Sequence, residues 1–282
     1  MRKVTAAVVA LLVAASAASA DSVRVRFSEG LVHGFLALRT TDGATVADGD
    51  LIQSARAGRV TTRLVFRFRD GSIRDETAVF TQNGVFRLAS DHLVQKGPTF
   101  GHPFEAWIDR ASGRVRTKYV DDDGKEKDVS EQMTLPDDLS NGIILTLLKN
   151  VAAQAAPPTL SMVAFTPKPR LVKLEISRAA NDAFTLNGST RHATHYVVKI
   201  DIGGFAGLVA PLVGKQPPDS HVWILPGDAP AFVKSEGPLH LGGPIWRIEL
   251  VSPVWRQEQT TARRTPEGAT LRRAPARQSP HP

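Results

Sequence analysis

The stretch VTTRLVFRFR, residues 60–69, shows the pattern that recurs through most of this chain. Its apolar side chains at Val60, Leu64, Phe66 and Phe68 fall on one side of an extended backbone, because successive side chains of a strand point to opposite faces. The polar side chains at positions 61, 63, 67 and 69 fall on the other side. This alternation predicts a half-buried antiparallel strand with one face on a core and one face in solvent.

Turn signals beside this stretch predict a meander of short strands. Asp70-Gly71 and Asn83-Gly84 are Asx-Gly pairs, which are favoured in tight hairpin turns. Asp121-Asp122-Asp123-Gly124 is a further turn signal; its carboxylates are interrupted by lysines and lack the spacing of a calcium loop. The other expected strands cover residues 77–80, 85–89, 104–109, 114–120, 171–177, 183–187, 192–202, 222–225, 231–234 and 246–251.

Residues 136–151 break the strand rhythm. Apolar side chains at positions 139, 143, 147 and 151, with companions at 144 and 148, predict an amphipathic helix with a broad apolar stripe. Pro136 and the acidic Asp137 suit its first turn, and Pro157-Pro158 ends the segment. We expect the stripe to lie against the concave side of the sheet.

The predicted fold class is therefore α+β, a curved antiparallel β-sheet that forms a partial barrel wrapped around one amphipathic helix. A strongly twisted sheet of about eleven strands tends to curl or close. A break near residue 157 into two layers is the alternative. We expect three regions: a signal peptide at 1–20, a single β-rich domain at 21–255 and a disordered basic tail at 256–282.

The leader and the composition indicate export. Arg2 and Lys3 precede an apolar run, and Ala18-Ser19-Ala20 is the small-x-small pattern at which a signal peptidase cuts. We expect a periplasmic or secreted protein with no transmembrane segment in the mature chain. The sequence has 42% hydrophobic residues and no cysteine, which excludes disulfides, cysteine-ligated metal sites and a lipoprotein anchor.

Much of the formal net charge of +7 belongs to the C-terminus. Residues 256–282 hold six arginines against two glutamates, and Leu271 is their only large aliphatic side chain. Such a composition favours disorder, either as a plain solvated extension or as an electrostatic contact with an anionic envelope surface. Residues 21–255 carry a net charge of only +1, which argues against a nucleic-acid partner.

No catalytic signature is found, so we assign no catalytic residue, metal or cofactor and lean away from an enzyme. The serine-hydrolase elbow, the zincin helix and the phosphate-binding loop are absent from the sequence. His192 and His195 would point to opposite faces of one strand, roughly 10 Å apart, so they cannot share a metal there. We expect both to be outward-facing polar residues.

The glycine-rich apolar stretch 202–214 is the most distinctive segment. It is either a buried plug at one end of the sheet or a mobile lid over a ligand cavity. Each candidate cavity-lining residue can equally be a plain core residue. The candidates are Phe205, Leu208, Val209, Leu212, Trp107, Trp223 and Trp246.

The order of motifs in the second half of the chain resembles that of uncharacterised bacterial exported proteins that contain a domain of unknown function. The motifs are Gly214-Lys215-Gln216-Pro217-Pro218, Val222-Trp223-Ile224, Ala229-Pro230-Ala231-Phe232 and the run from Gly243 to Leu250. The outline of a leader and a curled sheet around a helix is similar to the periplasmic lipoprotein carriers LolA and LolB. The chain departs from LolB in having no lipid-bearing cysteine.

Together these features favour a non-enzymatic binding protein for an apolar small molecule or a lipid. The first alternative is an envelope scaffold that binds a protein partner through sheet edges and the arginine-rich tail. The second is an unrecognised hydrolase, in which His192 or His195 would meet a carboxylate from a distant strand.

Overall fold

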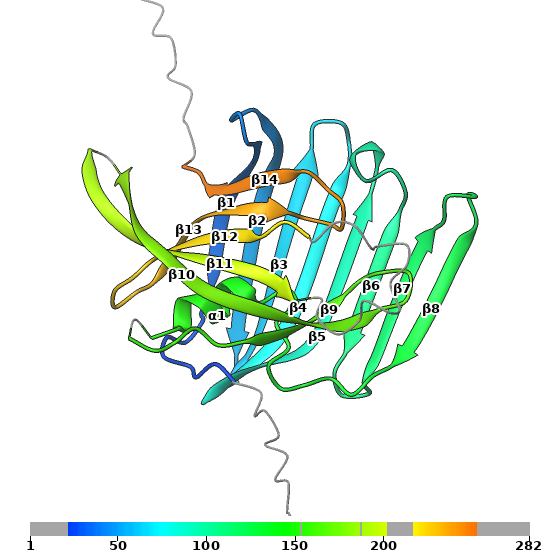
Figure 1. Ribbon diagram of the computed structural model, residues 1–282, viewed down its shortest axis with the longest axis horizontal. Coiled ribbons are helices and arrows are strands. Elements are labelled where there is room, and N and C mark those ends of the chain that lie inside the picture. Colours follow the sequence, from blue (N-terminus) through cyan, green and yellow to red (C-terminus); the bar gives the residue numbers. More distant parts are fainter. Residues whose placement is uncertain (1–21, 153, 187, 202–216, 253–282) are drawn as a thin grey trace, which may run out of the picture. The chain divides into compact units, whose positions relative to one another are not determined.

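Antiparallel strands make up most of the structure (Figure 1). The computed structural model of the chain describes residues 22–152, 154–186, 188–201 and 217–252. The strands are β1 (Val32–Thr40), β2 (Thr45–Arg56), β3 (Arg59–Phe68), β4 (Ile73–Asn83), β5 (Val85–Lys96), β6 (Phe104–Asp109), β7 (Arg114–Val120), β8 (Glu126–Gln132), β9 (Leu160–Ala164), β10 (Arg170–Leu186), β11 (Ser189–Asp201), β12 (Ser220–Leu225), β13 (Ala231–Pro238) and β14 (Ile245–Leu250). A short 3₁₀ helix (Pro98–Phe100) follows β5, and α1 (Ile144–Asn150) lies between β8 and β9.

Two meanders join to form this sheet. Within β1–β8 and within β9–β14, every strand pairs with its neighbour in sequence. The two meanders meet where β1 pairs with β14, with Leu36 opposite Leu250 and Leu38 opposite Ile248. The strands at the two edges of the sheet are therefore β8 and β9, and the connection between these edges carries α1.

The alternating stretch that starts at Val60 is β3, as predicted. Val60 and Phe66 are fully buried, whereas Arg63 and Arg67 are exposed on the other face. The Asp70-Gly71 turn joins β3 to β4, with the backbone N–H of Phe68 donating to the carbonyl of Ser72 at 2.9 Å. The predicted hairpin at Asn83-Gly84 joins β4 to β5. Two turns predicted from the sequence thus join β3 to β4 and β4 to β5.

The predicted helix over 136–151 is too long. Helical structure begins only at Ile144, because Ser140 and Asn141 bond to the backbone of β9. The amide of Asn141 donates to the carbonyl of Val163 at 3.0 Å and accepts from its N–H at 2.8 Å. Gly142 follows with φ of 66°, a left-handed conformation that interrupts a helix. Leu139 and Ile143 are buried as the apolar stripe predicted.

The main core unites the two meanders. Leu147 and Leu148 of α1 belong to one buried cluster with side chains from β3–β7 and from β9–β12. Because inner-face residues of both meanders enter the same cluster, the sheet curves instead of lying flat. A second cluster, which includes Leu38, Phe66 and Trp246, lies where β1 and β14 join.

All described residues belong to one compact unit that ends at Ser252. In the part of the chain that the structure describes, no helix has the length and hydrophobicity needed to cross a membrane. The predicted leader and basic tail, and residues 202–214, lie outside the described residues.

Candidate functional site

A narrow cleft lies between α1 and the inner face of the sheet, and we call it the inner cleft. Its volume is about 90 Å³. Half of its wall is aliphatic or aromatic, and the rest is polar or glycine. The lining residues are Leu36, Leu51, Gln53, Thr62, Leu64, Glu76, Gly142, Leu145, Thr146, Lys149, Phe232 and Ile248.

The alternation of the strands places the apolar part of this lining. Leu36, Leu51 and Leu64 come from β1, β2 and β3, and Leu51 lies directly opposite Leu64 in the register. Ile248 of β14 continues the same floor across the seam between the two meanders. Leu145 covers this floor from α1. The cleft therefore depends on the β1–β14 pairing and on the position of a seven-residue helix.

A buried ionic network closes one side of the inner cleft. The ammonium of Lys149 lies 2.5 Å from the Glu29 carboxylate, which also accepts a hydrogen bond from the Gln53 amide at 2.9 Å. The side chain of Gln82 accepts from the backbone N–H of Glu29 at 2.7 Å. The positive charge of Lys149 is therefore neutralised by Glu29, and Lys149 contributes to the wall of the cleft as part of an ion pair.

A second group of charges lies on β4 and β5, and its member Glu76 lines the inner cleft. Both terminal nitrogens of Arg74 donate to the Glu76 carboxylate at 3.1 Å. Asp91 is only 1% exposed, and neither of its carboxylate oxygens has a hydrogen-bond partner in the described residues. Burial, and then repulsion from Glu76, raise the pKa of Asp91 well above its ordinary value. Asp91 packs against Gly142. A Cβ added to Gly142 would lie 2.9 Å from a carboxylate oxygen of Asp91.

The outer face of the sheet carries Trp107 beside a shallow polar groove of about 310 Å³, lined by Arg63, Asp75, Thr77, His92 and Val94. The ring of Trp107 stacks on His92 with centroids 5.2 Å apart, and the Arg116 guanidinium lies 5.0 Å from its centroid. The structure therefore places Trp107 on the face opposite to the inner cleft.

Trp223 lies in a separate polar cluster on β10–β13. Its indole N–H donates to Asp182 at 2.7 Å, and its ring stacks on His195 at 4.2 Å. Asp182 lies 3.3 Å from Nδ1 of His195, and Nε2 of His195 lies 2.9 Å from Nδ1 of His221. Burial lowers the pKa of His195, so the imidazole is neutral near pH 7. This hydrogen-bonded chain can hold or relay a proton.

Trp246 lies in the second core cluster, where its ring centroid is 5.5 Å from that of Phe68. The three candidate tryptophans thus have three different surroundings, and none of them lines the inner cleft. Phe205, Leu208, Val209 and Leu212 lie outside the described residues. A ligand-binding role for all seven stays a prediction.

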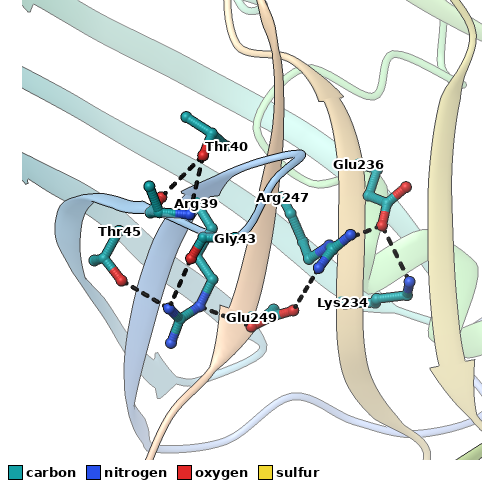
Figure 2. Close-up of polar contacts among 9 residues, drawn as sticks. Arg39, Thr40, Gly43, Thr45, Lys234, Glu236, Arg247 and Glu249 are labelled. Atoms are coloured by element: carbon teal, nitrogen blue, oxygen red, sulfur yellow. Dashed lines mark hydrogen bonds and ion pairs between the residues drawn. The ribbon is translucent and has the colours of Figure 1, made fainter.

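A ladder of charges crosses the seam between the meanders on the outer face (Figure 2). Arg39 on β1 bonds Glu249 on β14 at 3.0 Å, and Arg247 lies 3.6 Å from that same carboxylate. Arg247 bonds Glu236 on β13 at 2.9 Å, and Lys234 lies 3.1 Å from it. These pairs help to hold β14 beside β1, and so maintain the floor of the inner cleft on the other face.

Sequence reasoning missed the polar wall of the inner cleft. In β4 the inward positions 74 and 76 are charged, so the strand shows no apolar alternation there. Burying two charged side chains on the inner face lowers the stability of a protein unless the charges are paired, so such residues mark an ion pair or a functional site. That signal becomes visible only once the register of β4 is known.

No family model matches the chain. No curated protein matches it either. Among solved structures it is similar to a protein described as a beta-barrel-like protein of domain of unknown function DUF1849 from Brucella abortus, with 10% sequence identity and a TM-score of 0.45. That match covers 81% of this chain and 100% of the other. The similarity to LolA and LolB stays a prediction.

Proposed function

We propose that this chain is an exported, periplasmic or secreted protein that binds an apolar or lipid-like molecule and catalyses no reaction. The observation that carries the proposal is the inner cleft, in which an aliphatic floor from three neighbouring strands and β14 lies beneath α1. Binding sites for small molecules combine apolar walls with a few placed polar groups, and this cleft has both.

In this proposal the curved sheet wraps around α1 as a partial barrel. The support is the shared core, because Leu147 and Leu148 pack in one cluster with strands of both meanders. A helix held in this way forms one wall of the cleft. Small displacements of α1 would change the width of the cleft, since Leu145, Thr146 and Lys149 all line it.

The size and chemistry of the cleft define the ligand. A volume of about 90 Å³ is below the range of roughly 300–1,000 Å³ usual for drug-sized ligands. It accommodates a narrow alkyl chain or a single ring, for which an apolar lining is the main source of affinity. Thr62 and Thr146 add hydroxyl groups that can orient a polar end of such a molecule.

Isothermal titration calorimetry with octan-1-ol, a probe with a narrow alkyl chain and one polar end, tests the proposal. Leu145→Trp fills the cleft, whereas Leu241→Trp places the same ring at an exposed turn and is the matched control. We expect the wild type and Leu241→Trp to bind the probe equally, and Leu145→Trp to bind it at least about tenfold more weakly. Equal binding by all three proteins, or no binding by the wild type, would reject the proposal.

A hydrolase is the second candidate, and the chain Asp182–His195–His221 is the observation that favours it. The carboxylate comes from β10, the strand adjacent to that of His195, and not from a distant strand. A histidine oriented by a carboxylate is a common general base. Hydrolysis of p-nitrophenyl butyrate that falls at least about tenfold in His195→Gln would favour this candidate, and an unchanged rate would remove it.

A further inference from the structure

A cluster of exposed apolar side chains lies where β14, β1 and β2 meet. Leu31 is 87% exposed and Phe35 is 43% exposed, although most large apolar side chains of the described residues are buried. We call this cluster the apolar rim. It consists of Leu31, Phe35, Ile52 and Val251.

The pairing of the strands makes the rim continuous. The backbone N–H of Val251 donates to the carbonyl of Phe35 at 2.9 Å, so these two residues are directly opposite each other and share the outer face. Ile52 lies opposite His33, whose ring centroid is 4.8 Å from that of Phe35. Phe35, Ile52 and Val251 therefore lie on the outer face of three adjacent strands and form one surface. Contiguous exposed apolar surface on a folded protein usually marks a contact site.

Basic groups flank this surface. Arg56 and Arg59 lie opposite each other at the hairpin between β2 and β3, and both are exposed. In the described residues no ion pair engages either of them. The nearest acid of the rim strands, Asp50, is already bonded to His33 and Arg67. Asp48 of β2 is also exposed and is not engaged by an ion pair among the described residues, so two positive charges stand against one negative charge beside the rim.

The chain continues from Val251 and Ser252 into the C-terminal segment, which adds six arginines against two glutamates from residue 256 onward. Apolar side chains beside basic residues match an anionic bilayer surface, where the apolar groups enter the interface and the cations attract the lipid headgroups. β1, β2 and β14 each have a hydrogen-bonded strand on both sides. A protein partner therefore cannot add a strand to the sheet at the rim.

We propose that the apolar rim, with Arg56 and Arg59, docks the protein on an anionic lipid surface. This is a contact of the whole protein with a membrane and is distinct from the binding of one molecule in the inner cleft. The rim and the cleft lie on opposite faces of the same strands, since Leu36 and Leu51 face the cleft.

Vesicle co-sedimentation tests this proposal with the protein purified from cells that produce it. We expect binding to vesicles of phosphatidylcholine with one quarter phosphatidylglycerol, and at least about tenfold weaker binding to phosphatidylcholine alone. The double variant Phe35→Ser, Ile52→Ser and the double variant Arg56→Glu, Arg59→Glu should each lower binding to the anionic vesicles at least about tenfold.

Leu186→Ser and Leu241→Ser are the matched controls, because both leucines are exposed but lie outside the rim. They should bind the anionic vesicles like the wild type, and circular dichroism should show that all variants are folded. The proposal would be overturned if the wild-type protein did not bind anionic vesicles, or if the rim variants bound them with the affinity of the wild type. A co-purified protein that is lost only from the rim variants while vesicle binding persists would also overturn it.

Discussion

The side chain of Asn150 accepts a hydrogen bond from the backbone N–H of Phe27 at 2.8 Å, across 123 residues of sequence. The same oxygen accepts from the N–H of Arg26 at 2.9 Å, while the amide nitrogen donates to the carbonyl of Thr146. A seven-residue helix has little stability of its own. Its position over the inner cleft therefore depends on tertiary contacts such as this one.

Replacing Asn150 by alanine should loosen both the end of α1 and the segment around Phe27. The change leaves two backbone N–H groups without their acceptor, so we expect a loss of about 2 kcal/mol in the free energy of unfolding. Urea denaturation measures this loss. The exposed Gln154→Ala four residues later should stay within about 0.5 kcal/mol of the wild type. An equal effect of the two variants would contradict the role given to Asn150.

Gly49 on β2 leaves room for an aromatic ring of the second core cluster. An added Cβ there would lie 2.6 Å from the ring of Phe66 and 2.9 Å from the Cβ of Leu36. Gly49→Ala should therefore destabilise the protein by about 1–3 kcal/mol through overpacking. Gly30→Ala, where an added Cβ meets nothing within 4 Å, is the control and should unfold at nearly the wild-type urea concentration.

Ala57 is strained in the hairpin between β2 and β3. Its φ of 50° makes it the one described non-glycine residue in the left-handed region. Glycine adopts that region without steric cost, so Ala57→Gly should stabilise the protein by about 0.5–1 kcal/mol. Ala44→Gly, at a hairpin position without a positive φ, should not stabilise it. A lower melting temperature for Ala57→Gly would contradict this assignment.

Asp91 should make stability depend on pH in the direction opposite to that of most carboxylates. Its pKa is raised in the folded state, by burial first and by Glu76 second, while Arg74 opposes the shift. The folded protein then binds the proton more tightly than the unfolded chain. The contribution of Asp91 is fully present below a pH of about 4 and is lost as the pH rises through the folded pKa.

The difference in unfolding free energy between the wild type and Asp91→Asn isolates the pH-dependent contribution of Asp91 to stability. Urea denaturation across pH 4 to 8 should show the wild type losing stability relative to Asp91→Asn as the pH rises. Asp70→Asn is a suitable comparison, because hydrogen bonds from Thr99 and Ser72 lower the pKa of Asp70, so its stabilising effect should instead be lost at low pH. A constant difference for Asp91→Asn would show that its carboxyl is not perturbed.

Strands with a clear alternation and a nearby turn signal could be predicted from the sequence, and others could not. The predicted segments 104–109 and 114–120 coincide with β6 and β7. β8 has alternating partial burial but charged or polar residues at almost every position, and as an edge strand it needs no apolar face. β2 contains Asp48, Gly49 and Asp50, residue types that are depleted in strands, and its neighbours hold it in place.

The inner cleft could not be predicted, because it depends on the pairing of β1 with β14. Leu36 and Ile248 line the same cavity although they are distant in sequence, and neither hydrophobic periodicity nor turn chemistry reports such a pairing. The helix was predicted too long for a related reason. Its apolar spacing continues back to Leu139, but the side chains of Ser140 and Asn141 bond the backbone of β9.

Methyl NMR with decan-1-ol tests the central claim most directly, since it shows which residues an apolar molecule touches. Leucine-labelled wild-type protein should show saturable shifts at Leu51, Leu64 and Leu145, and none at Leu241, which is exposed outside the cleft. Filling the cleft with Leu145→Trp should abolish the shifts at Leu51 and Leu64. Shifts confined to surface leucines, or unchanged spectra at saturating decanol, would contradict binding in the inner cleft.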